Sequence, residues 1–265
     1  MSNPRPDERD LQSQLQTLYQ NPADLTRAIS ALKSLGLCDA TAGDTHPDAD
    51  LDLLRPQRCG FPEVIYGERK STELILQLIC AQQSAGQCSL VTRIRPESAG
   101  VVAEHFPAAI VNSVANTVRV PVTDQPSMGG PVFVVTAGSS DRVVAEEALE
   151  TLRWMNVECA LIQDVGVAGP HRLLQHVETL RKAAVIVCVA GMEAALPSVL
   201  GGYVPCPVIG VPTSVGYGAS LGGLTAMLSM LTCCASNVVC VNIDAGFKGG
   251  YVAGLIASRS KNALS

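Results

Sequence analysis

The stretch AAVIVCVAGMEAALPSVLGGYVPCPVIGVP (183–212) decides the fold, because two apolar runs in it flank a short helical segment. Runs of this kind, rich in β-branched residues, stand at 132–137, 159–164, 184–190, 207–212 and 238–243. A helical stretch follows each run, and the clearest are 141–155 and 171–181. Continuous apolar strands that alternate with helices are typical of a parallel sheet buried on both faces. We therefore expect residues 126–265 to form an α/β domain with a three-layer, doubly wound parallel sheet.

The preceding residues predict a smaller α+β module, because helices and strands no longer alternate regularly. Apolar residues at helical spacing predict two short amphipathic helices in residues 1–36, and an Asp-rich linker follows at 38–57. The later segments predict strands at 60–67 and 90–94 and helices at 71–81 and 97–105. The expected domains are therefore 1–125 and 126–265.

Charge is scarce and unevenly placed. Charged residues make up 16% of the chain, and none occurs from Ala194 to Ile243, whereas a typical soluble domain carries about 25%. A membrane-spanning helix needs about 20 consecutive apolar residues, but prolines and glycines interrupt this window throughout. The first ten residues are polar, without the apolar core of a signal peptide. With a net charge of −5, we expect a cytoplasmic protein that binds neither membranes nor nucleic acid.

Ten cysteines are many for such a protein, yet the chain has no CxxC pair and no zinc-like spacing. We therefore predict no dedicated metal site. Most of the cysteines lie in apolar runs, and we expect about eight of them to act as small hydrophobic residues. The adjacent Cys233 and Cys234, next to a strand–helix junction, are the exceptions.

Ligands of doubly wound sheets bind beyond the carboxyl ends of the strands. The first strand ends in TAGSSD (136–141), where backbone N–H groups at a helix start can hold a phosphate. The alternative is an ordinary helix N-cap made by Ser139 or Ser140.

The next strand ends carry further polar groups. DVGVAGPHR (164–172) places His171 and Arg172 on the same rim, although such residues are often only exposed. Glu193 follows the third strand in an apolar stretch, which would favour its neutral form and suit a general base. The alternative is a carboxylate that stabilises a helix N-terminus. The glycine- and hydroxyl-rich loop 210–223 can wrap around a ligand, but it lacks the GxGxxG and P-loop patterns.

A family resemblance gives these motifs a more specific interpretation. TAGSSD, DVGVAGPHR, AGMEAALPSVLGG, GVPTSVGYGASLGG, TCCAS and NIDAGF occur in this order and resemble the C-terminal half of the LarB family. The upstream RCGFPEVIYGERKS (58–71) is similar to the family's Arg-x-Gly-x-Pro-Glu-Val-Ile segment. The resemblance implies a flavodoxin-like, PurE-like catalytic domain.

The resemblance implies carboxylation of nicotinic acid adenine dinucleotide at pyridinium C5, with hydrolysis of its phosphoanhydride. The products would be AMP and pyridinium-3,5-biscarboxylic acid mononucleotide, a precursor of the nickel-pincer nucleotide cofactor. By motif, Cys234 is the nucleophile that adds to the ring, while Cys233 replaces a small polar residue, and Glu193 is the base. The residues implied in substrate binding are Gly138, Ser139, Ser140, Asp141, Asp164, Gly166, His171, Arg172, Gly191, Met192, Ser214, Gly216, Tyr217 and Gly218.

The resemblance also implies partners of this reaction. Carbon dioxide or bicarbonate is the co-substrate, and Mg²⁺ is shared with the substrate phosphates rather than held by a carboxylate cage. A homo-octamer would form through the PurE-like domain, with an uncharged helix at 219–235 as an interface. A continuous helix would place Cys234 at its negative end, so the bound pyridinium or a helix break is needed to stabilise the thiolate.

Two other functions stay open. A PurE-type aminoimidazole ribonucleotide carboxylase or mutase fits TAGSSD and PHR, but the PurE stretch Ala-Gly-Gly-Ala-Ala-His-Leu-Pro reads AGMEAALP here, with Ala195 in place of His. The other alternative is a nucleotide-binding module that has the binding pocket but no catalytic activity. Several charged residues of the first domain either reach the substrate or pair on the surface: Arg55, Arg58, Glu63, Lys70 and Arg93.

Overall fold

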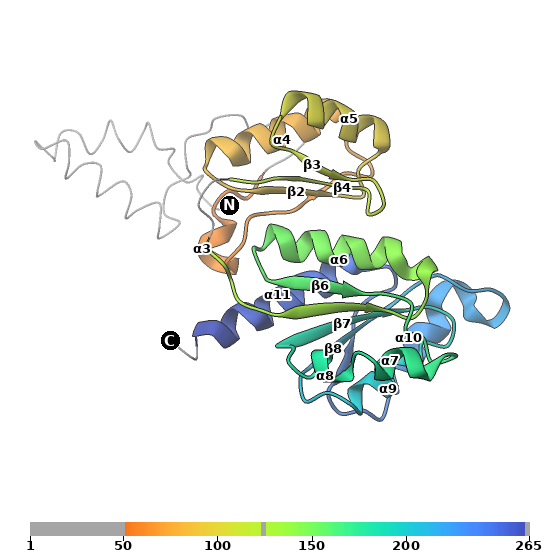
Figure 1. Cartoon of the computed structure of the whole chain (residues 1–265). Coiled ribbons are helices and arrows are strands. Elements are labelled where there is room, and N and C mark those ends of the chain that lie inside the picture. Colours follow the sequence, from red (N-terminus) through yellow and green to blue (C-terminus); the bar gives the residue numbers. More distant parts are fainter. Residues whose placement is uncertain (1–50, 123–125, 263–265) are drawn as a thin grey trace, which may run out of the picture.

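A computed structural model describes residues 51–122 and 126–262, which form two stacked parts (Figure 1). The smaller part comes from the first range and the larger part from the second. The two helices predicted in residues 1–36 lie outside the described residues.

The larger part is built on a five-stranded sheet with the order β6-β5-β7-β8-β9. The central strands are β5 (Val132–Thr136), β7 (Val185–Ala190) and β8 (Val208–Pro212), and the edges are β6 (Cys159–Ile162) and β9 (Val238–Cys240). All neighbouring strands are parallel. The chain runs outward from β5 in one direction and then returns to build the other half, so the predicted doubly wound fold is confirmed.

Helices cover both faces of this sheet (Figure 1). One face packs on α6 (Arg142–Trp154) and α11 (Gly246–Asn262), and the other on α7 (Pro170–Leu174), α8 (Val177–Leu180), α9 (Leu196–Gly201) and α10 (Leu224–Leu231). Alternate residues of β7 enter the two cores: Val185, Val187 and Val189 one of them, and Ile186, Cys188 and Ala190 the other. Both faces of the strand are therefore buried, as its continuous apolar run predicts.

The smaller part is a mixed four-stranded sheet, in the order β1-β2-β4-β3, with two helices on one face. Its elements are α3 (Arg55–Cys59), β1 (Ile65–Tyr66), α4 (Thr72–Ser84), β2 (Ser89–Thr92), α5 (Pro96–His105), β3 (Ile110–Asn112) and β4 (Thr117–Val120). The β3–β4 hairpin was not predicted, because β3 is an edge strand of three mostly exposed residues that leave no alternating pattern. The strand predicted at 60–67 shrinks to β1, and α3 begins within the last residues of the predicted linker.

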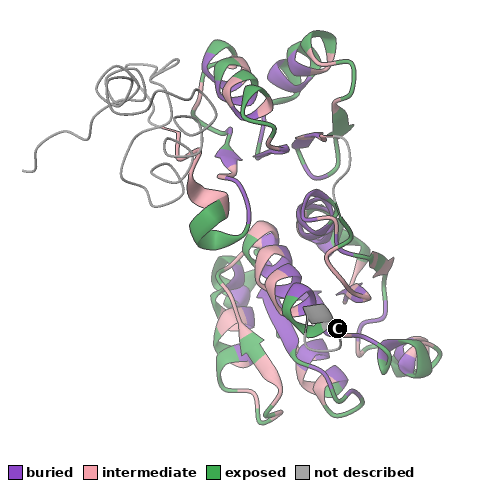
Figure 2. Ribbon diagram, turned by 90° about the vertical axis from the view of Figure 1, so that its left-hand side faces the viewer, coloured by how far each residue is buried: buried purple, intermediate pink, exposed green. Residues whose placement is uncertain are grey.

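Helix α6 lies between the two sheets, so its outer face is covered by the smaller part (Figures 1 and 2). Three glutamates on this helix are buried: Glu146, Glu147 and Glu150 are 8%, 5% and 3% exposed. A buried carboxylate needs partners, and the smaller part supplies them. The pairs across the boundary are Asn112–Glu146 (3.1 Å), Arg93–Glu147 (3.6 Å) and Arg119–Glu150 (3.1 Å).

The pKa of Glu150 shows how far these partners compensate burial. Burial alone would raise the pKa, but hydrogen bonds from Arg153, Arg119 and Asn112 outweigh burial and hold the pKa below the ordinary value of 4.5. A lowered folded-state pKa stabilises the fold above the ordinary value, and this contribution is lost as the pH falls below it.

The substitution Arg119→Met is expected to lower the free energy of unfolding by about 1–3 kcal/mol at neutral pH, because Glu150 loses a charged donor at a buried position. The matched control Arg181→Met removes an ion pair whose Glu178 is 85% exposed, and it should cost less than about 0.5 kcal/mol. Urea unfolding measures both. The loss in free energy of unfolding caused by Arg119→Met should become smaller below pH 4.5. Equal losses in the two variants would contradict the stabilising role of the Arg119–Glu150 pair.

Two predicted helices differ from the structure. The one at 171–181 is split into α7 and α8. The one at 219–235 is a 3₁₀ segment (η2, Gly218–Gly223) followed by α10, because Leu221 (φ 47°) and Gly222 (φ 63°) adopt the left-handed conformation. α10 ends at Leu231, so Cys234 lies three residues beyond the end of the helix.

The uncharged window from Ala194 to Ile243 contains α9, β8, η2, α10 and β9. Short elements and loops alternate in it, as its prolines and glycines predict. Among the described residues, no helix combines the length and the apolar composition that crossing a bilayer requires.

Candidate active site

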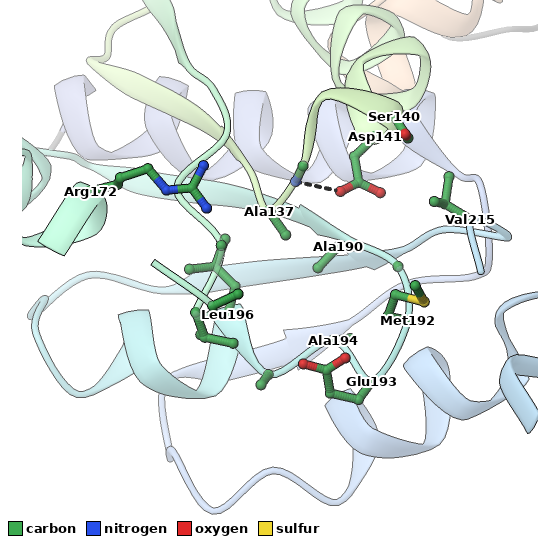
Figure 3. Close-up of a pocket in the computed structure, with 16 residues that line it drawn as sticks. Ala137, Ser140, Asp141, Arg172, Ala190, Met192, Glu193, Ala194, Leu196 and Val215 are labelled. Atoms are coloured by element: carbon green, nitrogen blue, oxygen red, sulfur yellow. Dashed lines mark hydrogen bonds between the residues drawn. The ribbon is translucent and has the colours of Figure 1, made fainter. Parts of the chain in front are cut away.

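A cavity of about 310 Å³ opens at the carboxyl ends of the parallel strands (Figure 3). The loops after β5, β6, β7 and β8 all contribute to its wall. The structure thus brings several strand-end motifs together, where ligands of such sheets bind. The residues implied by the sequence that line it are Gly138, Ser140, Asp141, Gly166, Arg172, Gly191, Met192 and Glu193.

Asp141 is a buried polar group of this wall and is 3% exposed. Its Oδ1 accepts a hydrogen bond from the Thr213 hydroxyl at 2.7 Å, and its Oδ2 accepts one from the Gly138 N–H at 2.9 Å. Burial raises the pKa of Asp141, and these hydrogen bonds offset only part of that effect. Neither Ser139 nor Ser140 caps the helix start, so the N-cap alternative is wrong. Both serines are exposed, and Ser140 faces the cavity.

Arg172 carries a positive charge into the cavity from α7, across from Glu193 (Figure 3). Its Nη1 donates to Asp164 Oδ2 at 2.5 Å, and the Asp164 N–H donates to Thr136 Oγ1 at 3.0 Å. Asp164 therefore orients the guanidinium relative to the end of β5. His171 is exposed and is not part of the cavity wall.

Glu193 lies on the cavity wall between two residues with left-handed backbone, Met192 (φ 54°) and Ala194 (φ 52°). This conformation costs about 1–2 kcal/mol for a residue with a side chain, and strained residues cluster at functional sites. Glu193 itself is exposed. The apolar surroundings predicted for it are therefore not present in the single chain, and its carboxylate is accessible to a ligand.

A second cavity, of about 640 Å³, adjoins the first between the smaller part and α6. The two cavities share Ser140 and Val215 in their walls. Arg93 and Arg95 line the second cavity from the smaller part, and Arg93 donates to the carbonyl oxygen of Asp244 at 2.6 Å. The sequence did not decide whether Arg93 reaches the substrate or pairs on the surface. The structure places it in the wall of the second cavity.

The loop after β8 connects to the second cavity through Ser214, whose N–H donates to Asp244 Oδ1 at 2.9 Å. The following Gly216, Tyr217 and Gly218 line neither cavity. Tyr217 is 81% exposed. Their part in ligand binding stays a prediction.

Cys234 lies at the opposite edge of the sheet. It precedes β9, which runs parallel to β8, so it stands at the amino ends of the strands. Asn237 fixes this segment, because its Nδ2 donates to the carbonyl oxygens of three residues that precede β8: Gly201, Val204 and Cys206. Cys234 is exposed and lines neither cavity. Within one chain, the structure does not bring Cys234 and Glu193 together.

The other cysteines divide by burial. Cys88 is buried, and burial raises the pKa of four further thiols, those of Cys159, Cys188, Cys206 and Cys240. Such thiols act as small hydrophobic groups rather than nucleophiles. Cys59 and Cys80 are exposed, so the expectation that about eight cysteines are of this kind was too high.

Across residues 51–122 and 126–262, no group of three His, Cys, Asp or Glu side chains is placed to hold a metal ion. Both oxygens of Asp141 already accept hydrogen bonds, and Asp244 accepts one from Ser214. The described side chains therefore form no carboxylate cage of the kind that holds a divalent ion without a ligand.

Sequence reasoning missed several residues at the cavities, among them Thr213, Val215 and Arg95. Thr213 holds Asp141, and its hydroxyl directly after the fourth strand was an available signal. Val215 lies in the wall shared by the cavities. An apolar residue in a loop gives no comparable signal.

Gly191→Ala is expected to destabilise the chain by about 1–3 kcal/mol by overpacking. A Cβ at Gly191 would lie 2.4 Å from the Val215 carbonyl oxygen and 2.6 Å from Thr213 Oγ1. Gly100→Ala is the matched control, because its Cβ would meet nothing within 4 Å and it lies in α5, where alanine is favoured. Thermal unfolding compares the two variants. A Gly191 variant as stable as the Gly100 variant would show that the cavity wall can move to accept a methyl group without loss of stability.

Comparisons with known proteins cover both parts of the structure. Residues 131–265 match the family described as AIR carboxylase, and residues 44–122 match the LarB/PurE-like N-terminal domain. An uncharacterized protein of Methanocaldococcus jannaschii is 39% identical over 216 residues, which cover 78% of this chain and 83% of that protein.

Other relatives match a shorter part of the chain. An N5-carboxyaminoimidazole ribonucleotide mutase of Methanocaldococcus jannaschii is 36% identical over 101 residues, which cover 37% of this chain and 59% of the mutase. A probable mutase of the same kind from Methanobrevibacter smithii is 30% identical over 132 residues, or 47% of this chain and 37% of that protein. The crystal structure of Treponema denticola PurE aligns with a TM-score of 0.40 and 20% identity, covering 51% of this chain and 81% of that chain.

Proposed function

Because the chain belongs to the LarB family, with a LarB/PurE-like N-terminal domain before an AIR carboxylase domain, we propose that it is a carboxylase and hydrolase of nicotinic acid adenine dinucleotide. It carboxylates pyridinium C5 and cleaves the phosphoanhydride. The products are AMP and pyridinium-3,5-biscarboxylic acid mononucleotide, which serves nickel-pincer nucleotide cofactor biosynthesis.

The observation that carries this proposal is the pair of adjoining cavities at the strand ends. A dinucleotide has two bulky halves joined by a pyrophosphate, and it needs two compartments joined by a polar neck. The cavities of about 310 and 640 Å³ meet at Ser140 and Val215. Both fall near the range of about 300–1,000 Å³ that is usual for small-molecule sites. Arg172 in the first and Arg93 and Arg95 in the second supply positive charge for phosphates.

The proposed chemistry uses a thiolate and a carboxylate. The Cys234 thiolate adds to the cationic pyridinium ring, and the ring electrons that neutralise the nitrogen make C5 nucleophilic. C5 then attacks carbon dioxide. Glu193 accepts the C5 proton, and expulsion of the thiolate restores the aromatic ring. Glu193 fits the role of the base because it is accessible from the first cavity.

In this proposal, Mg²⁺ binds only together with the substrate. The described side chains do not build a cage for it, so the substrate phosphates would supply most of its ligands. When bound, the ion would neutralise negative charge on the phosphoanhydride. Ser140 at the neck and Arg172 in the first cavity would orient these phosphates.

A PurE-type reaction on a mononucleotide is the second candidate, and the matches to N5-carboxyaminoimidazole ribonucleotide mutases favour it. A mononucleotide would need the first cavity alone. Against it, Ala195 stands where the PurE motif has a histidine, and it lies in the cavity wall. A methyl group there cannot transfer a proton.

One assay tests both candidates. The chain is incubated with nicotinic acid adenine dinucleotide, bicarbonate and Mg²⁺, and the products are identified by mass spectrometry. We expect AMP together with a carboxylated mononucleotide. Turnover of aminoimidazole ribonucleotide alone would establish the second candidate, and binding of the dinucleotide without turnover would identify a nucleotide-binding module.

A further inference from the structure

Two cysteines stand side by side just beyond α10. The helix ends at Leu231, Thr232 caps it, and Cys233 and Cys234 follow in a segment that is neither helix nor strand. Cys234 is exposed, and Cys233 is partly buried. The proposed function uses the Cys234 sulfur as a nucleophile and leaves the neighbouring sulfur without a role.

The Cys233 sulfur lies against the backbone that carries Cys234. It accepts a hydrogen bond from the Ala235 N–H at 3.4 Å, so the Cys233 side chain turns forward along the chain and passes its neighbour. Cys234 is the residue between the donor and the acceptor of this bond. Bringing the two sulfurs together therefore needs only a local movement of this segment.

The segment is anchored on both sides of the cysteine pair. The Cys233 N–H donates to the Met230 carbonyl oxygen at 3.4 Å, and the Val238 N–H donates to the Ala235 carbonyl oxygen at 3.1 Å. The Asn237 side chain donates to three carbonyl oxygens that precede β8. These bonds use neither sulfur, so α10 and β9 can stay in place while the sulfurs react.

The other described thiols are less suited to react with Cys234. Cys88 is buried, and Cys59 and Cys80 belong to the smaller part. Burial raises the pKa of four more, which keeps them in the unreactive thiol form: Cys159, Cys188, Cys206 and Cys240. Among the described cysteines, Cys233 is thus the best placed partner for an oxidised Cys234.

A disulfide between adjacent cysteines is easily reduced. Their Cα atoms are about 3.8 Å apart across a trans peptide, whereas disulfide-linked Cα atoms usually lie about 4.4–6.8 Å apart. The bond therefore forms under strain, and strained or exposed disulfides have the higher reduction potentials of labile, regulatory bonds. Such a bond shields both sulfurs from further oxidation, and a dithiol can open it again.

We propose that Cys233 and Cys234 are a reversible redox-modification site: a peroxide oxidises the Cys234 thiolate, and the Cys233 thiol then closes a disulfide between the two residues. The effect on activity rests on the proposed function, because Cys234 is its nucleophile, but the disulfide itself does not. A thiolate that reacts with a pyridinium ring is also reactive toward peroxide, and an opening that admits the ring admits this smaller molecule. Oxidation would thus stop carboxylation without destroying the nucleophile.

The redox step balances with peroxide as the oxidant. The Cys234 thiolate attacks one peroxide oxygen, the O–O bond breaks, and the products are a sulfenic acid and hydroxide, which takes up the proton that the thiol had released. The Cys233 sulfur then attacks the Cys234 sulfur, the S–O bond breaks, and the departing oxygen leaves as water with the Cys233 proton. The two thiols lose two electrons and two protons in all, and the peroxide becomes two water molecules.

Peptide mass spectrometry of the full chain tests the disulfide itself. The chain is treated with hydrogen peroxide, the remaining thiols are blocked with a maleimide, and a peptic peptide whose only cysteines are Cys233 and Cys234 is analysed. We expect this peptide to lose two hydrogen atoms, to stay unblocked and to regain both thiols with dithiothreitol. A peptide that keeps both thiols, carries Cys234 as a sulfinic acid or is linked to a different cysteine would overturn the proposal.

Cys233→Ser separates the second thiol from the nucleophile. Before oxidation, its carboxylation rate should stay within a few-fold of wild type. After excess peroxide, the wild-type chain should lose at least about tenfold in rate and recover most of it with dithiothreitol. The variant should not recover, because its Cys234 sulfenic acid continues to sulfinic acid, which dithiothreitol does not reduce. Equal recovery of the two chains would overturn the proposal.

A Cys59→Ser, Cys80→Ser chain is the matched control, because it removes the two exposed thiols of the smaller part and keeps the adjacent pair. It should be inactivated and restored like the wild type. A control chain that is no longer inactivated by peroxide would assign the effect to those thiols and overturn the proposal.

The redox site and the proposed function can fail separately. If the disulfide forms reversibly but the wild-type chain makes no carboxylated product, the redox site stands and the proposed function fails. If carboxylation proceeds but the mass of the peptide with Cys233 and Cys234 never changes, the proposed function stands and the redox site is overturned.

Discussion

Replacing Cys234 by serine is expected to reduce carboxylation of nicotinic acid adenine dinucleotide by at least about 10³-fold. A serine hydroxyl is nearly isosteric but is not ionised at neutral pH, so it cannot add to the pyridinium ring. Cys234 is exposed and lies outside the packed core, so the fold should be unchanged. Thermal unfolding and the release of AMP and carboxylated product measure the two effects.

Cys233→Ser is the matched control for this substitution. The Cys233 sulfur accepts a hydrogen bond from the Ala235 N–H at 3.4 Å and is partly buried, so it has a structural contact that a hydroxyl can replace. We expect its activity to stay within a few-fold of wild type. A Cys233→Ser chain that loses carboxylation while Cys234→Ser keeps it would assign the nucleophile to the other sulfur.

Replacing Glu193 by glutamine is expected to lower the rate by about 10²–10⁴-fold, which is the usual contribution of a positioned acid or base. Glutamine keeps the shape of the side chain and so should leave dinucleotide binding unchanged. The thiolate adduct should still form and then persist, because its C5 proton has no acceptor. Ultraviolet absorbance of the dearomatised ring follows the adduct, and calorimetry follows binding.

Glu178→Gln is the control for the loss of a carboxylate, because Glu178 is 85% exposed on α8 and pairs only with Arg181 among the ion pairs of the described residues. Its rate should equal that of the wild type. A Glu193→Gln chain with a normal rate and no accumulated adduct would mean that another group, such as solvent or a substrate phosphate, accepts the proton.

The fold of the larger part could be predicted because its central strands are buried on both faces. Such burial requires continuous apolar runs, as in β7, where every residue is buried. The β3–β4 hairpin could not be predicted in this way, because Ile110 and Val111 are exposed and their strand is short. The helix predicted at 219–235 failed for another reason: apolar spacing does not reveal the left-handed backbone at Leu221.

The candidate site could be predicted where polar residues and glycines directly follow the end of a strand. Gly138, Asp141, Gly191 and Glu193 meet in one cavity for that reason. The second cavity was not predictable, because it forms between the two parts and depends on how the smaller sheet packs on α6. The position of Cys234 was implicit in the sequence, since a residue before a parallel strand lies at the amino edge. Motif similarity alone carried no such geometric constraint.

The buried glutamates of α6 have a consequence for how the chain can be divided. Removing the smaller part would leave Glu146, Glu147 and Glu150 on an open face without Asn112, Arg93 and Arg119. The two parts therefore share their folding free energy and are expected to melt in a single cooperative transition, as one foldon rather than as two separable modules.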